Sequence, residues 1–222
     1  MLPFTGATMK KIFLFAFTLA AWSLMSGISP GQSPGAARSD QPRLVKGQVL
    51  TSTNLPSIRI RFDKRFKYVG SQKFILYDRA QVEQVFFVDA DNEKRVERMY
   101  MIQFEGYLPN VDATYNYAVE KTIDLGGQTY IINTETIPNV QAALNQDPRS
   151  DSAHAGAFLA GKGFRFSESV MYQRFVRLVD QTKRNEFILV YIEETGTIAV
   201  PDKDRAMQEL STHALKGFTI LK

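Results

Sequence analysis

Residues 82–104 read VEQVFFVDADNEKRVERMYMIQF, and this stretch decides the fold class of the chain. Two runs rich in valine, phenylalanine, methionine and tyrosine, residue types that favour strands, flank the short polar segment 89–93. A polar connection of this kind suits two antiparallel neighbours. The stretch therefore predicts a hairpin of two long strands, residues 82–88 and 95–104.

Strand-like patterns continue on both sides of this hairpin. Residues 58–62 alternate isoleucine or phenylalanine with arginine, as a strand with one solvated face does. Residues 186–193 contain the apolar run FILVYI without alternation, which is typical of a central strand buried on both faces. Further strands are expected at 66–68, 73–77, 113–117, 128–133 and 170–179, and helices at 137–144, 154–159 and 202–216. These elements predict an α+β domain: an antiparallel β-sheet of about six to eight strands with meander or hairpin connections, and a few flanking helices including a C-terminal helix.

The N-terminal part has the composition of a secretory signal. Two lysines, Lys10 and Lys11, precede the apolar run 12–24, which is shorter than the roughly 20 residues that a membrane-spanning helix needs. The small residues 35–37 offer a cleavage site. We therefore expect residues 1–37 to be a signal peptide, with Met9 as an alternative start and an uncleaved membrane anchor as the alternative interpretation. The protein is then exported, periplasmic or extracellular, with no transmembrane span after cleavage.

The rest of the chain is expected to form one domain behind a short arm. Residues 38–54 are polar and show neither strand nor helix periodicity at their start, which predicts a flexible N-terminal arm. Residues 55–222 have the length of a single globular domain with a sizeable core. Because the chain has no cysteine, disulfides, thiol nucleophiles and thiolate metal sites are excluded.

Charge argues against a nucleic-acid partner. Without Lys10 and Lys11 the chain keeps 25 of its 27 basic residues against 23 acidic ones, which is close to neutral. Nucleic-acid-binding proteins carry a concentrated basic face. The one dense basic group comprises Arg59, Arg61, Lys64, Arg65 and Lys67. It is interpreted as the solvated face and turn of a hairpin, with contact to an anionic surface as the alternative.

The sequence assigns no catalytic residue, metal site or cofactor. His154 and His213 are the two histidines of the chain, and no Gly-x-Ser-x-Gly motif is present. Asp151, Ser152 and His154 are neighbours in one polar stretch interpreted as a loop, which does not make a catalytic triad. No histidine or carboxylate spacing typical of a metal site occurs either.

A candidate ligand-binding site follows from the second strand of the hairpin. Met101, Gln103 and Glu105 share one face of that strand, opposite the face of Tyr100, Ile102 and Phe104. If that face lines the interior, burial raises the pKa of the Glu105 carboxyl and makes it a ligand group or an acid; if it faces solvent, these are ordinary strand residues. Three tyrosines follow closely, and the candidate site comprises Met101, Gln103, Glu105, Tyr107, Tyr115 and Tyr117.

These observations favour non-enzymatic binding of a small apolar or amphipathic molecule by an exported domain. Two alternatives stay open at this point. One is an envelope protein-protein interaction module that adds a strand through its arm or a sheet edge. The other is an acid-dependent hydrolase or isomerase that uses Glu105.

Overall fold

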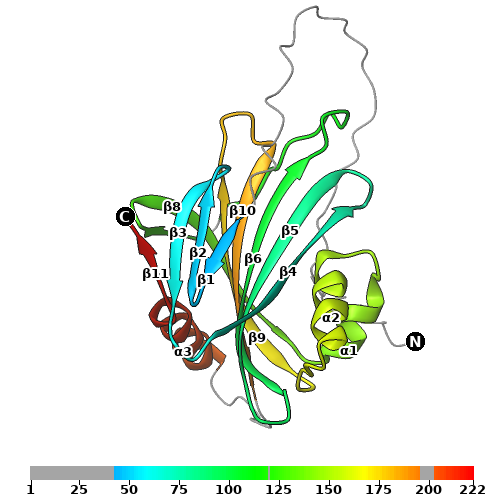
Figure 1. Cartoon of the computed structure of the whole chain (residues 1–222), viewed down its shortest axis with the longest axis vertical. Coiled ribbons are helices and arrows are strands. Elements are labelled where there is room, and N and C mark those ends of the chain that lie inside the picture. Colours follow the sequence, from blue (N-terminus) through cyan, green and yellow to red (C-terminus); the bar gives the residue numbers. More distant parts are fainter. Residues whose placement is uncertain (1–42, 120, 196–202) are drawn as a thin grey trace, which may run out of the picture.

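The structure is a computed structural model that describes residues 43–119, 121–195 and 203–222. The expected signal peptide, residues 38–42 of the expected arm and the expected start of the last helix at residue 202 lie outside the described residues. In chain order the elements are β1 (Leu44–Lys46), β2 (Val49–Thr53), β3 (Ser57–Phe62), β4 (Lys67–Leu76), β5 (Ala80–Ala90), β6 (Val96–Tyr107), β7 (Thr122–Leu125), β8 (Gln128–Ile137), α1 (Val140–Gln146), α2 (Asp151–Gly161), β9 (Val170–Leu178), β10 (Asn185–Glu194), α3 (Lys203–Lys216) and β11 (Phe218–Leu221) (Figure 1).

The strands form two antiparallel sheets, so the predicted α+β class is confirmed. The large sheet has the order β4-β5-β6-β10-β9-β8-β7, and the small sheet has the order β1-β2-β3-β11. The predicted hairpin is the β5–β6 pair, in which Val85 lies opposite Ile102. The predicted central strand is β10, which pairs with β6 on one side and β9 on the other.

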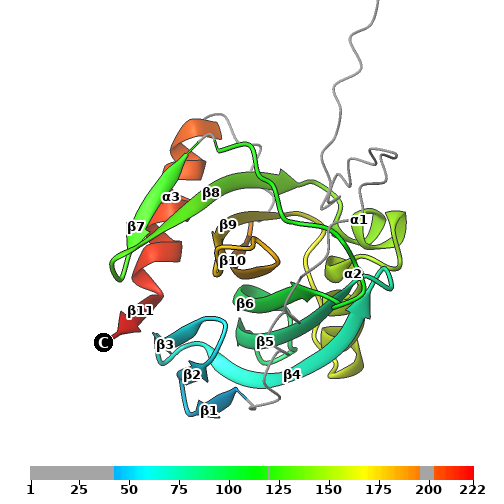
Figure 2. The same cartoon turned by 90° about the horizontal axis from the view of Figure 1, so that it is seen from above.

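One face of the large sheet packs against the small sheet and helix α3. Figure 2 shows α3, β11 and β3 on one side of the large sheet and helices α1 and α2 on the other. The core on the α3 side is rich in aromatic rings: Phe62 of β3 stacks on Phe87 of β5 with 4.2 Å between ring centroids, and Tyr100 of β6 lies 5.1 Å from Phe62. Burying each such side chain stabilises the fold by about 1.5–3 kcal/mol.

Helices α1 and α2 cover the opposite face of the large sheet. Ala155 and Leu159 of α2 are buried against a second apolar cluster, to which β6 contributes Met101 and β10 contributes Val190. Strands β5, β6 and β10 therefore send alternate side chains into two different cores. Both faces of these strands are removed from water.

Several elements differ from the sequence prediction. Residues 44–53 form β1 and β2 rather than an arm without regular structure. Residues 113–117 form no strand. Helix α2 begins at Asp151, because the Ser150 hydroxyl accepts a hydrogen bond from the amide of Ala153 at 3.1 Å and caps the helix. The prediction also lacked β11, which pairs with β3.

Helix α3 ends where expected. Its last turn contacts the large sheet closely: the Tyr100 hydroxyl donates to the carbonyl oxygen of Ala214 at 2.6 Å, and a Cβ atom on Gly217 would lie 2.1 Å from that hydroxyl oxygen. None of the helices in the described ranges is both long enough and apolar enough to cross a membrane.

Candidate functional site

The structure brings the residues of the predicted ligand site together at one end of β6. Gln103 and Glu105 are 0 % and 2 % exposed, so the interpretation of this face as solvent-facing is wrong. The Gln103 side-chain amide donates to Glu105 Oε2 at 2.7 Å, and the Tyr115 hydroxyl donates to Glu105 Oε1 at 2.9 Å. The ring of Tyr107 stacks on that of Tyr115 with 4.4 Å between centroids. Met101, two residues before Gln103, packs in the apolar cluster under α2.

Sequence reasoning missed three buried polar residues that surround this group. Gln84 donates to Gln103 Oε1 at 2.7 Å, and Gln103 also donates to Asp151 Oδ2 at 3.2 Å. Glu186 of β10 lies directly opposite Glu105 and accepts a hydrogen bond from the Tyr117 hydroxyl. We call this set the buried polar network: Gln84, Gln103, Glu105, Tyr115, Tyr117, Asp151 and Glu186.

Burial governs the proton equilibria of the network. Burial raises the pKa of Asp151 above its ordinary value. Burial and, after it, the neighbouring carboxylate of Glu105 raise the pKa of Glu186 well above its ordinary value. The hydroxyls of Tyr115 and Tyr117 also have raised pKa values, chiefly because they are buried, and they therefore stay protonated as donors.

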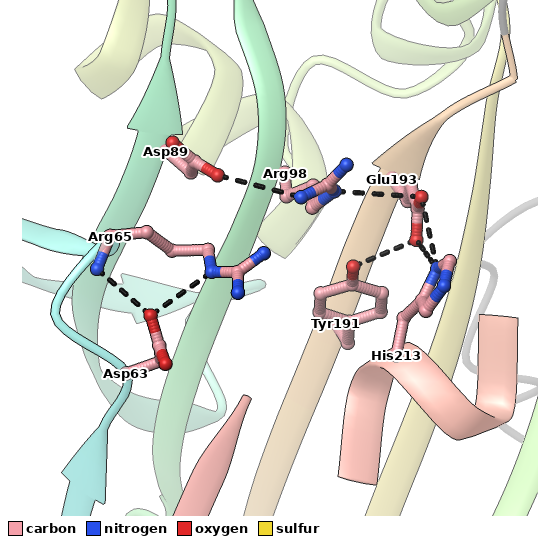
Figure 3. Close-up of polar contacts among 7 residues, drawn as sticks. All are labelled: Asp63, Arg65, Asp89, Arg98, Tyr191, Glu193 and His213. Carbon is pink, nitrogen blue, oxygen red and sulfur yellow. Dashed lines mark hydrogen bonds and ion pairs between the residues drawn. The ribbon is translucent and has the colours of Figure 1, made fainter. Parts of the chain in front are cut away.

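A pocket of about 230 Å³ lies elsewhere, where the end of helix α3 meets the large sheet. Its lining residues come from the β3–β4 turn, β6, β10 and the last turn of α3: Arg65, Phe66, Arg98, Tyr191, His213, Lys216 and Gly217. Figure 3 shows Arg65, Arg98, Tyr191 and His213 with the acidic residues around them. We call this hollow the α3 pocket.

The β3–β4 turn places Arg65 at the α3 pocket. Asp63 Oδ1 accepts hydrogen bonds from the backbone amide and from Nε of Arg65, each at 3.0 Å. The amide of Asp63 in turn donates to the carbonyl oxygen of Gly217 at 2.9 Å, which ties the turn to the end of α3. Two segments far apart in sequence thereby form one wall of the pocket.

Glu193 organises the opposite wall (Figure 3). Its Oε2 accepts a hydrogen bond from the Tyr191 hydroxyl at 2.7 Å and lies 2.9 Å from Nδ1 of His213. Burial raises the pKa of Tyr191, so its hydroxyl remains a donor. The carboxylate thus holds an aromatic ring and an imidazole in fixed places at the rim.

The cationic side chains of the α3 pocket keep unused hydrogen-bonding capacity. The Arg98 guanidinium lies 3.5 Å from Glu193 and 3.8 Å from Asp89, longer than the 2.7–2.9 Å of charge-assisted hydrogen bonds, and it makes no hydrogen bond to any described residue. The Lys216 side chain forms neither an ion pair nor a hydrogen bond within the described part of the chain. Their N–H groups are therefore available to an incoming anion.

The lining of the α3 pocket consists of charged and aromatic residues and one glycine. It contains no serine or threonine that the His213–Glu193 pair could activate. Among the described residues no group of three or more histidine, aspartate or glutamate side chains is placed to hold a metal ion.

The α3 pocket was not predicted from the sequence. Arg65 was grouped with its basic neighbours and interpreted as a hairpin turn, and His213 carries no motif. The lining comes from four separate stretches of the chain, so no local pattern connects its members. Comparisons of the chain with protein-family models, with curated proteins and with solved structures each found no match.

Proposed function

We propose that this chain is a non-enzymatic binding domain for a small amphipathic molecule that carries an anionic group, and that the α3 pocket is its site. One observation carries the proposal: Arg65, Arg98 and Lys216 gather in one hollow beside the rings of Phe66 and Tyr191. Guanidinium groups recognise carboxylates and phosphates through paired N–H donors. Aromatic rings beside them accommodate the apolar body of the same ligand.

The size and charge of the α3 pocket define the ligand further. A volume of about 230 Å³ is below the roughly 300–1,000 Å³ of sites for drug-sized molecules, so the ligand is small or only partly enclosed. Asp63, Asp89 and Glu193 offset much of the positive charge around the pocket. A single anionic group bound by Arg98 fits this balance better than a polyanion does.

The location differs from the site predicted from the sequence. Around Glu105 the candidate residues contact one another and fill the interior. The α3 pocket is open to solvent, and half of the His213 side chain at its rim is exposed. The ligand class stays amphipathic, as expected from the sequence, but the proposed site moves to the other end of β10.

Three ligands of similar size test the proposal. Benzoate, benzamide and benzylamine share a ring but carry a negative charge, no charge and a positive charge. We expect benzoate alone to perturb amide NMR signals around Arg98 and Gly217 of the full chain, because the lining offers donors and no free acceptor for a cation. Replacing Arg98 with glutamine should raise the benzoate Kd about 10- to 100-fold, since hydrogen bonds to charged groups contribute about 1.5–3 kcal/mol.

Arg205→Gln is the matched control. Arg205 lies on α3 as His213 and Lys216 do, but it pairs with Glu209 at 2.9 Å and is not part of the lining. This variant should bind benzoate as the unchanged chain does. Equal perturbation by benzamide and benzoate, or an unchanged benzoate Kd in Arg98→Gln, would contradict the proposal.

A further inference from the structure

Two buried carboxyl groups face each other across strands β6 and β10. Glu105 and Glu186 are paired in register, which places their Cβ atoms about 5 Å apart on the same face of the sheet. They are 2 % and 1 % exposed. Like charges directly opposite one another destabilise a sheet, and burying them away from water increases the cost.

Residues 108–118, which we call the covering segment, hold both carboxyl groups from above. Tyr115 of this segment donates to Glu105, and Tyr117 donates to Glu186. Tyr115 is the one buried residue of the segment, and its backbone amide also donates to the carbonyl oxygen of Lys183 at 2.8 Å. Arg184 adds a fixed anchor by donating to the carbonyl oxygens of Leu108 and Ala113 at 2.9 and 3.1 Å.

The charges around the pair do not balance when every acid is ionised. The titratable and charged groups that face Glu186 are Glu105 of β6, Tyr107 at the end of β6, Tyr115 and Tyr117 of the covering segment, Asp151 of α2 and Arg174 of β9. Three carboxylates would then face a single guanidinium, which itself donates to the side-chain oxygen of Asn133 at 3.0 Å. The second oxygen of Glu186, Oε1, has no hydrogen-bond partner among the described residues. While the covering segment is packed over Glu105 and Glu186, at least one of these two carboxyl groups must therefore carry a proton.

We propose that the Glu105–Glu186 pair is a proton-sensitive latch, which keeps the covering segment closed while it carries a proton and releases the segment when both carboxyl groups are ionised. Release admits water to both carboxylates and removes the repulsion between buried charges. The latch lies at the start of β10, on the opposite face of the large sheet from the α3 pocket, so it is independent of ligand binding there.

Hydrogen exchange of the full chain between pH 5 and pH 9 tests the latch. Glu186→Gln keeps an oxygen that accepts from Tyr117 but cannot ionise, and a ratio of exchange rates between the two proteins cancels the intrinsic effect of pH. We expect peptides from 108–118 to exchange faster in the unchanged chain, with the ratio rising by up to about tenfold per pH unit until the pH reaches the pKa of Glu186 in the closed form. Peptides from β9 should show no such rise.

Glu97→Gln is the matched control, because Glu97 lies on β6, as Glu105 does, but is exposed. Its exchange should follow the unchanged chain at every pH. A constant ratio for peptides from 108–118, or an equal rise in the β9 peptides, would overturn the latch. The unchanged chain gives a second test on its own: exchange of the covering segment must rise more steeply with pH than exchange of β9.

Discussion

Glu186 makes the stability of the fold depend on pH. Its carboxyl is almost fully buried, and desolvation followed by the charge of Glu105 raises its pKa, while Tyr117 and Arg174 lower it. The effects that raise the pKa of Glu186 outweigh those that lower it. A folded-state pKa above the unfolded value means that the folded state binds the proton more tightly. The stability from that proton is complete below the unfolded pKa of about 4.3 and is lost as pH rises through the folded pKa.

Glu186→Gln should therefore gain stability relative to the unchanged chain as pH rises. The difference in unfolding free energy is expected to grow by up to about 1.4 kcal/mol per pH unit between the unfolded and folded pKa values. Urea unfolding at several pH values between 4 and 8 measures it. Glu97→Gln, the same change at an exposed position, should give a constant difference. Parallel stability curves for Glu186→Gln and the unchanged chain would contradict the assigned raising of the pKa.

At the scale of elements, the junction between α3 and the large sheet depends on the absence of a side chain. Gly217 lies against Tyr100, whose ring touches Phe66 and Phe218 and whose hydroxyl binds the last turn of α3. The neighbouring elements leave no room for a methyl group. The same contact sets the position of His213 and Lys216 at the α3 pocket.

Gly217→Ala should destabilise the domain by about 1–3 kcal/mol, because the added Cβ displaces the Tyr100 hydroxyl from Ala214. Gly161→Ala is the control at the end of α2, where a Cβ meets nothing within 4 Å. It should be neutral or stabilising by up to about 1 kcal/mol. Chemical denaturation of both variants measures the contrast, and equal effects would show that the close approach to Tyr100 has no energetic weight.

Elements were predictable where the signal is local. The β5–β6 hairpin follows from two strand-forming runs and a short polar connection, and the central position of β10 follows from its unbroken apolar run. Strands β1 and β2 were missed because the apolar residues of 44–53 stand in two adjacent pairs, Leu44-Val45 and Val49-Leu50, and do not alternate with polar ones. The pairing of β6 with β10 joins residues about 80 positions apart, so the contact between Glu105 and Glu186 leaves no trace in a local pattern. The candidate residues of β6 were predictable as a group; their burial and their partners were not.

At the scale of the whole molecule, the two cores share their supporting strands. Phe87, Tyr100 and Leu189 enter the core beside α3, while their immediate neighbours enter the core beneath α2. Neither core can unfold without disrupting the strands that support the other core. The domain therefore does not divide into two parts that could unfold independently.

We expect a single cooperative unfolding transition. Far-ultraviolet circular dichroism reports the sheets and helices, and near-ultraviolet signals report the buried tyrosines of both cores, so the two curves should coincide within error. The calorimetric and van't Hoff enthalpies should also agree. Two resolved transitions would show that the cores are separable.

The alternation along β10 limits how this strand can change over evolutionary time. Glu186 faces the covering segment, and Glu193 faces His213. Between them, successive side chains of β10 point to opposite faces of the sheet. Substitutions that keep the character of each position are compatible with both environments. A single inserted or deleted codon between 186 and 193 is not, because it would turn every later side chain to the other face and move Glu193 away from the histidine that it holds. The strand can vary in composition, but its length is fixed.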